Sequence, residues 1–295
     1  MTKKFTIAEI QNQSAFEQKY RYTEKIGDYA EGKIRQRKYV VENLCTDFSD
    51  KKATTLALRI LNCTGRHPCN NPFCPKCRHA QQELFAQSMI ENFGNVDADK
   101  LRFLTILHEV HYNSADINLT LIKKLKKKLD NDLDKLQLFA DENIRLLGAY
   151  EIHAIAADEK LSDRKVNTLS ALGYDKDKKS PSFLLHFHAV ICMPKFKNEK
   201  YDIEGELRKI YQNSYQVDFT KLRDDKSHTD NLHDIATYML KFRLQHSVSV
   251  ASDDNSKQFT RTQYSTLYSP IIAKSVVMAV ESCNGFQGLK TRRYT

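Results

Sequence analysis

Two histidines stand two residues apart inside an apolar run, Leu185-His186-Phe187-His188-Ala189-Val190. Such a run predicts a β-strand, in which alternate side chains point to the same face. His186 and His188 would then leave the strand together, and their imidazoles could bind one metal ion. A single histidine in an apolar strand is more often a core residue, so a metal site needs a third ligand nearby.

Two candidates for the third ligand, Glu151 and His153, lie in the apolar run over residues 146–156. The run predicts a second strand with both side chains on one face. Antiparallel pairing with the histidine strand would bring both candidates close to His186 and His188. Two imidazoles and one carboxylate leave coordination positions open for substrate and water, which is typical of a catalytic divalent-metal site.

A tyrosine with charged neighbours lies in residues 231–245, a segment predicted to be helical. Tyr238 is four residues after Asp234 and three before Lys241, so the three side chains would share one helix face. A phenol has an ordinary pKa of about 10, so a nucleophilic tyrosine needs cationic help, which Lys241 and a metal ion would supply. Asp234 could activate water to break a phosphotyrosine bond. In isolation, the pattern also describes a solvated helix face.

Four of the seven cysteines fall within fifteen residues of one another: Cys63, Cys69, Cys74 and Cys77. In a chain expected to be cytoplasmic, this spacing favours a metal site over disulfides. Four thiolates suit a tetrahedral structural Zn²⁺, and His67 and His79 are alternative fourth ligands if Cys63 is too distant.

The elements that would position these residues follow the order strand, helix, strand, strand, helix, strand. The strands are predicted at residues 101–110, 146–156, 182–192 and 216–222, and the helices between them at 118–141 and 203–215. This order is typical of the split βαβ arrangement, so we expect an α+β protein with a ferredoxin-like, or RRM-like, antiparallel sheet. Outside this unit we expect helices within 15–45 and at 81–93 and 271–283, a strand at 53–61, and loops at 158–182 and 247–262.

The 295-residue chain carries 46 Lys and Arg against 37 Asp and Glu, a formal net charge of +9. This balance favours a polyanionic partner, although many soluble proteins are basic. The sequence lacks an apolar run long enough to span a membrane and the apolar core of a signal peptide. We expect a cytoplasmic protein with no membrane partner. It also lacks a G-x-x-x-x-G-K-[ST] phosphate loop, so DNA unwinding would need another protein.

Four motifs occur in the order found in rolling-circle replication initiators: the cysteine segment, the strand motif Phe103-Leu104-Thr105-Ile106, the histidine pair and the Tyr238-x-x-Lys241 helix. From about residue 15 to 245 the chain resembles these initiators of the HUH endonuclease family, particularly the single-tyrosine initiators of small plasmids of Gram-positive type. Two positions depart from the family pattern. Phe187 stands where proline is common, and Asp234 replaces glutamate.

The resemblance implies an HUH nuclease domain over residues 98–246, preceded by a helical, zinc-binding segment over 1–97 and followed by a C-terminal extension over 247–295. It implies Glu151, rather than His153, as the third ligand of a catalytic Mn²⁺ or Mg²⁺. Tyr238 would nick a plasmid origin through a covalent 5′-phosphotyrosine intermediate. The partners would be origin DNA, both double- and single-stranded, a host helicase and the replication machinery.

Other functions fit parts of the same pattern. A related transposase or conjugative relaxase would share the tyrosine chemistry. A non-catalytic zinc-containing DNA-binding regulator would use His186 and His188 only for packing. A zinc hydrolase could use the two histidines as ligands, but the sequence has no strong motif for its general base. The variant Tyr238→Phe distinguishes a nuclease from a regulator, because nicking requires the phenol and DNA binding does not. If Tyr238 is not the nucleophile, Tyr211 and Tyr215 are the next candidates.

Overall fold

The computed structural model describes residues 37–293, except for 48, 65–67, 158, 160, 199–200, 214, 243 and 251–261. Most of the predicted helical segment at 15–45 therefore lies outside the described residues, which begin with a helix over 37–44. One continuous hydrophobic core runs from Val40 to Leu289. No helix of the described part is long and apolar enough to cross a membrane. The domain boundaries at 97/98 and 246/247 stay predictions.

A five-stranded antiparallel sheet forms the centre of the molecule, with the strand order β4-β1-β3-β2-β7. The strands are β1 (Leu101–His111), β2 (Leu146–Ile155), β3 (Ser182–Cys192), β4 (Val217–Lys221) and β7 (Lys290–Arg293). The first three were predicted to be adjacent, and the structure confirms this with β3 between β1 and β2. The short strand β7 was not predicted; it pairs with the outer edge of β2.

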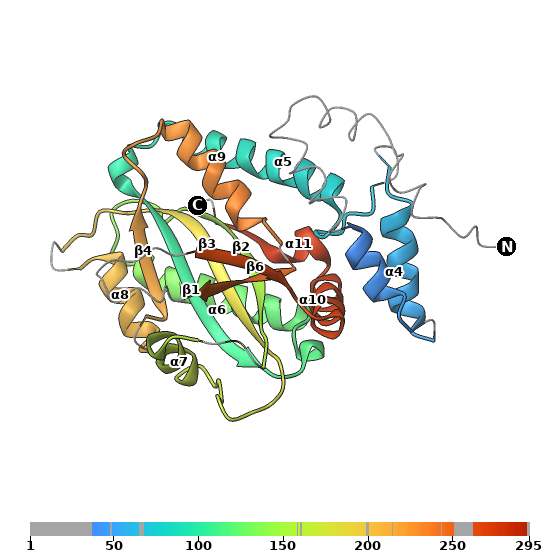
Figure 1. Cartoon of the computed structure of the whole chain (residues 1–295). Coiled ribbons are helices and arrows are strands. Elements are labelled where there is room, and N and C mark those ends of the chain that lie inside the picture. Colours follow the sequence, from blue (N-terminus) through green and yellow to red (C-terminus); the bar gives the residue numbers. More distant parts are fainter. Residues whose placement is uncertain are drawn as a thin grey trace.

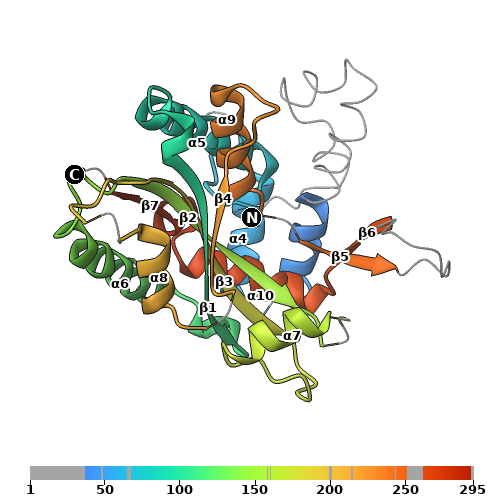
Figure 2. The same cartoon turned by 90° about the vertical axis from the view of Figure 1, so that its left-hand side faces the viewer.

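Side chains alternate between the two faces of the sheet as the strand period requires. Phe187, between the two histidines, is fully buried on one face, where its ring lies 4.9 Å from that of Tyr150. Helices α6 (Leu119–Gln137) and α8 (Ile203–Ile210) lie together along one face of the sheet (Figure 2). Asn118 caps α6 by accepting hydrogen bonds from two backbone amides at its start.

Two helices pack against each other over one end of the sheet, α5 (Pro75–Phe93) and α9 (His228–Met239) (Figure 1). Helix α5 begins six residues before the predicted helix at 81–93, and α9 ends well before residue 245. The remaining long helix, α10 (Pro270–Ser282), matches its prediction and leads through α11 (Gly285–Leu289) into β7.

Three predictions outside the sheet were wrong. Residues 53–61 form part of helix α4 (Lys51–Leu61), because their apolar side chains recur at helical spacing and Asp50 caps the first turn. The predicted loop at 158–182 contains helix α7 (Asp163–Ser170), capped by Ser162. The predicted loop at 247–262 begins and ends in the paired strands β5 (Gln245–Val250) and β6 (Thr262–Leu267), and residues 251–261 lie outside the described residues.

Candidate metal centres and tyrosine site

Glu151, His186 and His188 form a cluster that could hold a metal ion. Antiparallel pairing places Glu151 of β2 directly opposite His186 of β3. One ligand atom from each of the three residues lies within 4.8 Å of the others. The expected convergence of the two histidines on one face is therefore confirmed.

The two imidazoles have the free nitrogens that a metal ligand needs. The Nε2 atoms of His186 and His188 are buried, and neither has a hydrogen-bond partner within the described structure. His188 Nε2 lies 3.3 Å from Glu151 Oε2, but outside hydrogen-bond geometry. Its other ring nitrogen, Nδ1, is hydrogen-bonded to Thr105 Oγ1 at 3.0 Å, which fixes the ring orientation. Unpaired buried nitrogens beside a carboxylate fit a cation between them.

The protonation states of the cluster also suit a cation. Burial, the largest effect, would raise the pKa of Glu151, yet the proximity of His188 and the Lys241 ammonium lower it to about 2. Lys241 Nζ lies 3.4 Å from Glu151 Oε2. Burial, followed by the charges of the neighbouring histidines, lowers the pKa of His186 well below its ordinary value. A charged carboxylate and a neutral imidazole are the forms that bind metals.

His153, the other candidate for the third ligand, lies outside the cluster. Its ring centroid is 5.6 Å from that of His186, and it pairs across the sheet with Leu184 rather than with a histidine. Burial lowers the pKa of His153. The structure therefore groups Glu151, and not His153, with the two histidines.

Tyr238 lies beside this cluster with its side chain partly open to solvent. Its ring centroid is 5.7 Å from that of His188 and 6.0 Å from that of Phe103, and the residue is 47% exposed. Phe103 in turn stacks on His188 at 5.5 Å. Lys241 Nζ lies 4.0 Å from the Tyr238 ring centroid, so the ammonium contacts both the tyrosine and Glu151.

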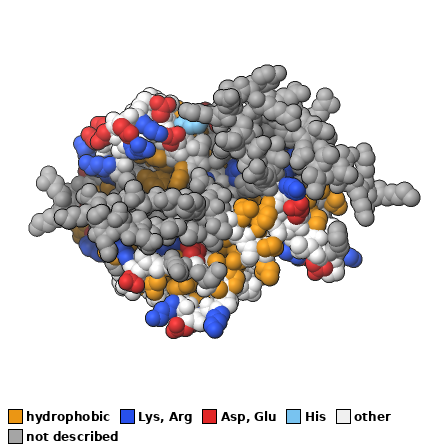
Figure 3. Space-filling view, viewed as in Figure 1, with side chains coloured by type: hydrophobic (Ala, Val, Ile, Leu, Met, Phe, Trp, Pro, Cys, Tyr) orange, Lys and Arg blue, Asp and Glu red, His pale blue; other side chains and the backbone are white. Residues whose placement is uncertain are grey.

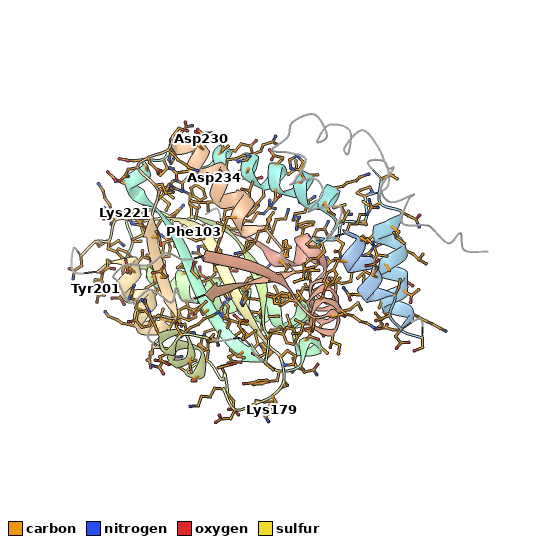
Figure 4. All side chains as sticks on the ribbon, viewed as in Figure 1. Phe103, Lys179, Tyr201, Lys221, Asp230 and Asp234 are labelled. Carbon is orange, nitrogen blue, oxygen red and sulfur yellow. The ribbon has the colours of Figure 1, made fainter. Side chains whose placement is uncertain are left out.

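The structure corrects the predicted arrangement on the helix. Helix α9 ends at Met239, so Lys241 lies beyond the helix in a turn that its backbone N–H closes by donating to the Tyr238 carbonyl at 3.2 Å. Asp234 lies within α9 (Figure 4), but its exposed carboxylate is ion-paired with Lys226. Acidic and basic side chains alternate over this part of the surface (upper left in Figure 3).

A pocket of about 420 Å³ joins the site to α7. Its lining includes His186, Tyr238 and Lys241, together with Arg164 of α7 and Tyr215 of the α8–β4 connection. No sequence pattern predicts α7 at this position, because its residues are mostly polar and belong to no recognised motif. Tyr215 was considered only as a substitute nucleophile.

The four clustered cysteines form a second group that could hold a metal ion. All four are buried, and one sulfur from each lies within 4.8 Å of the others. Cys77 Sγ lies 3.4 Å from Cys63 Sγ and 3.6 Å from Cys69 Sγ. Cys74 immediately precedes α5 and Cys77 lies in its first turn, so the start of this helix positions two of the four sulfurs. Hydrogen bonds from the other three thiols lower the pKa of Cys63.

Of the two alternative histidine ligands, the structure describes only His79, which is not part of this group. His79 lies on α5 near Glu83, with 3.9 Å between the nearest ring nitrogen and carboxylate oxygen. His67 lies outside the described residues. The predicted set of four cysteines is therefore the one that the fold brings together.

Comparisons with known proteins identify no relative of this chain. A scan against protein-family models and searches of curated proteins and of solved structures found no match.

Proposed function

We propose that this protein is a metal-dependent, single-strand DNA endonuclease and strand transferase with Tyr238 as its nucleophile. The observation that carries the proposal is the position of a half-exposed tyrosine beside both the Lys241 ammonium, which is paired with Glu151, and the buried His-His-Glu cluster. The His188 ring and Lys241 Nζ lie 5.7 Å and 4.0 Å from the Tyr238 ring centroid. A core histidine pair would need neither the unpaired nitrogens nor the carboxylate.

The reaction would transfer the 5′-phosphate of one DNA segment from the 3′-oxygen of its neighbour to the tyrosine. The phenolic oxygen of Tyr238 attacks the scissile phosphorus and loses its proton to water, while Lys241 stabilises the phenolate charge. The bond from phosphorus to the 3′-oxygen breaks, and that oxygen takes up a proton to become a free 3′-OH. The 5′-phosphate stays on Tyr238. Attack by a 3′-OH on this phosphotyrosine reverses the reaction and rejoins a strand.

Glu151, His186 and His188 would hold the catalytic metal, with Thr105 orienting His188. When bound, Mn²⁺ or Mg²⁺ would polarise the scissile phosphate and neutralise charge that develops on it. Mixed nitrogen and carboxylate ligands suit Mn²⁺, while Mg²⁺ accepts the carboxylate and open water positions.

The cysteine group would hold a structural Zn²⁺. Sulfurs on a tetrahedron around Zn²⁺, each about 2.3 Å from the ion, are about 3.8 Å apart. Two sulfur separations in the cluster, 3.4 and 3.6 Å, approach this value.

The biological setting that we propose is rolling-circle replication of a plasmid. The first four strands have the order 4-1-3-2 of a ferredoxin-like sheet, as the resemblance to HUH initiators implies. The net charge of +9 suits origin DNA as a partner. A host helicase and the replication machinery would use the 3′-OH that nicking exposes.

The deciding experiment incubates the protein with single-stranded DNA from its own replicon and Mn²⁺, followed by denaturing electrophoresis. We expect a covalent protein–DNA adduct with the wild type and none with Tyr238→Phe. Tyr201→Phe is the matched control, because Tyr201 is also exposed but packs against Phe139. An adduct that persists in Tyr238→Phe would refute the assignment. DNA binding without any adduct would favour a non-catalytic DNA-binding regulator.

A further inference from the structure

The pocket beside Tyr238 has a second set of side chains that the cleavage reaction does not use. Arg164 and Tyr215 line it together with His186 and Tyr238. Its volume of about 420 Å³ lies within the range of about 300–1,000 Å³ typical of small-molecule sites. Apolar lining comes from the side chains of Leu107, Leu169 and Leu184.

Tyr215 is held in an unusual backbone conformation with its ring exposed. Its φ is 61°, in the left-handed region that residues other than glycine rarely adopt, and 55% of the residue is exposed. The next residue anchors it to β1: Leu107 N–H donates to the Gln216 carbonyl at 2.9 Å, and Gln216 Nε2 donates to the Leu107 carbonyl at 3.0 Å. Residues held in such conformations concentrate at functional sites.

Arg164 covers the ring of Tyr215 with its guanidinium group. The guanidinium carbon lies 4.1 Å from the ring centroid. Within the described part of the chain, no carboxylate pairs with Arg164, whereas the neighbouring Lys165 is paired with Glu159 at 3.4 Å. Among the described residues, the pocket therefore presents an aromatic ring beside a guanidinium group that has no carboxylate partner.

We propose that Arg164 and Tyr215 form a subsite for one unpaired nucleobase of the DNA strand that Tyr238 cleaves. The base stacks on Tyr215 and enters the apolar part of the pocket, and Arg164 contacts a flanking phosphate. Stacking on an aromatic ring requires a base that is not stacked in a duplex, so the subsite selects single-stranded DNA. This inference rests on the proposed nuclease function for the identity of the strand.

The test measures binding without cleavage. Fluorescence anisotropy compares a labelled oligothymidine with an abasic strand of the same length, which has the phosphates but no bases. Because base–aromatic stacking is worth about 1–3 kcal/mol, we expect wild-type protein to prefer the oligothymidine by about tenfold. Tyr215→Asn removes the ring but tolerates the left-handed backbone, and it should abolish this preference. Arg164→Gln should weaken binding of both strands.

Tyr201→Asn is the matched control for the ring. Tyr201, labelled in Figure 4, is 38% exposed and has Lys209 Nζ 5.9 Å from its ring centroid. It is not among the residues that line the pocket. The Tyr201→Asn variant should keep the wild-type preference for oligothymidine over the abasic strand. Equal affinity of wild-type protein for both strands, an unchanged preference in Tyr215→Asn, or an equal loss in Tyr201→Asn would overturn the subsite.

The adduct assay separates this failure from a failure of the nuclease proposal. A Tyr238 adduct with no Tyr215-dependent base preference would refute only the subsite. A Tyr215-dependent preference in a protein that forms no adduct would support the base subsite and refute the nuclease.

Discussion

The guanidinium group of Arg78 donates hydrogen bonds to two consecutive backbone carbonyls just after the tyrosine helix, those of Lys241 at 3.0 Å and Phe242 at 2.9 Å. Arg78 follows Cys77 in the first turn of α5. One turn later, Gln82 Nε2 donates to the Thr237 carbonyl at 2.9 Å. The cysteine group and the proposed nucleophile are therefore joined through the start of α5.

Arg78→Lys tests whether this link positions Lys241. Both hydrogen bonds leave one nitrogen, Nη1, of the rigid guanidinium plane. A lysine side chain is shorter and its ammonium is not held in a plane, so the turn carrying Lys241 should loosen. We expect adduct formation to slow about tenfold, equivalent to about 1.4 kcal/mol of transition-state stabilisation, while binding of duplex DNA stays unchanged. Arg59→Lys is the control, because Arg59 pairs with Glu281 at the surface. An unchanged rate in Arg78→Lys would show that the link is only structural.

Glu151→Gln and His153→Gln distinguish the two candidates for the third metal ligand. Glu151→Gln removes the only carboxylate of the cluster and should weaken Mn²⁺ binding and slow nicking by about 100-fold, within the range seen for ligand-shell changes. His153→Gln should change both by less than about threefold, since a supporting contact contributes little. Calorimetric Mn²⁺ titration and the adduct rate report the two effects. The reverse ranking would make His153 the ligand.

Asp234→Ala tests the role that the resemblance assigns to this carboxylate. The first nick should persist, because Asp234 is ion-paired with Lys226 and does not line the pocket. If Asp234 activates water for release, adducts should accumulate in Asp234→Ala and decay normally in Lys226→Ala, where the carboxylate is unpaired. The time course of adduct formation and decay measures both steps. Loss of the first nick in Asp234→Ala would assign it to the metal site or the fold.

The histidine pair and its carboxylate could be predicted from the sequence because strand periodicity is local. Two histidines at a spacing of two must share a face, and one antiparallel pairing then brings Glu151 opposite His186. The cysteine group was predictable for a similar reason, since its members are close along the chain.

The remaining parts of the site depend on contacts that no local pattern encodes. Arg164 is an exposed residue of a short polar helix, and only the path of the chain between β2 and β3 brings it to Tyr215. The end of α9 was predicted too late because the apolar spacing continues past Met239, whereas the Arg78 contacts stabilise a turn there. Strand β7 has four residues, too few for a recognisable alternation.

Zinc removal should expose four thiols together. In the native metal-loaded protein, only half-buried Cys45 should react readily with a thiol reagent, because the other six cysteines are buried. Chelation should release one Zn²⁺ and make four more thiols reactive, because the metal contributes on the order of 10 kcal/mol to the folding of the cysteine segment. Cys77→Ser should abolish zinc retention, whereas Cys45→Ser should not. Seven freely reactive thiols in the native protein would rule out the site.

His108 should make the protein less stable in mildly acidic solution. Its ring is buried between Tyr150 and Tyr211, at centroid distances of 5.6 and 6.5 Å, on the opposite face of the sheet from the metal cluster. Burial, with a smaller effect from the charge of Lys128, lowers the pKa of His108 from 6.5 to about 4. The unfolded chain therefore binds a proton at a pH where the folded protein does not.

The direction of the effect follows from this difference in proton uptake. The contribution of neutral His108 to the free energy of unfolding is complete above pH 6.5, the pKa of the imidazole in the unfolded chain. It is lost as the pH falls towards about 4, the pKa of His108 in the folded protein. Between pH 7 and pH 5, His108 should lower the free energy of unfolding by about 2 kcal/mol. His108→Phe keeps an aromatic ring between the two tyrosines but cannot titrate, so urea unfolding of this variant should lose that part of the pH dependence. Identical pH dependence in the wild type and His108→Phe would show that the imidazole is protonated in the folded protein, or that another group controls acid stability.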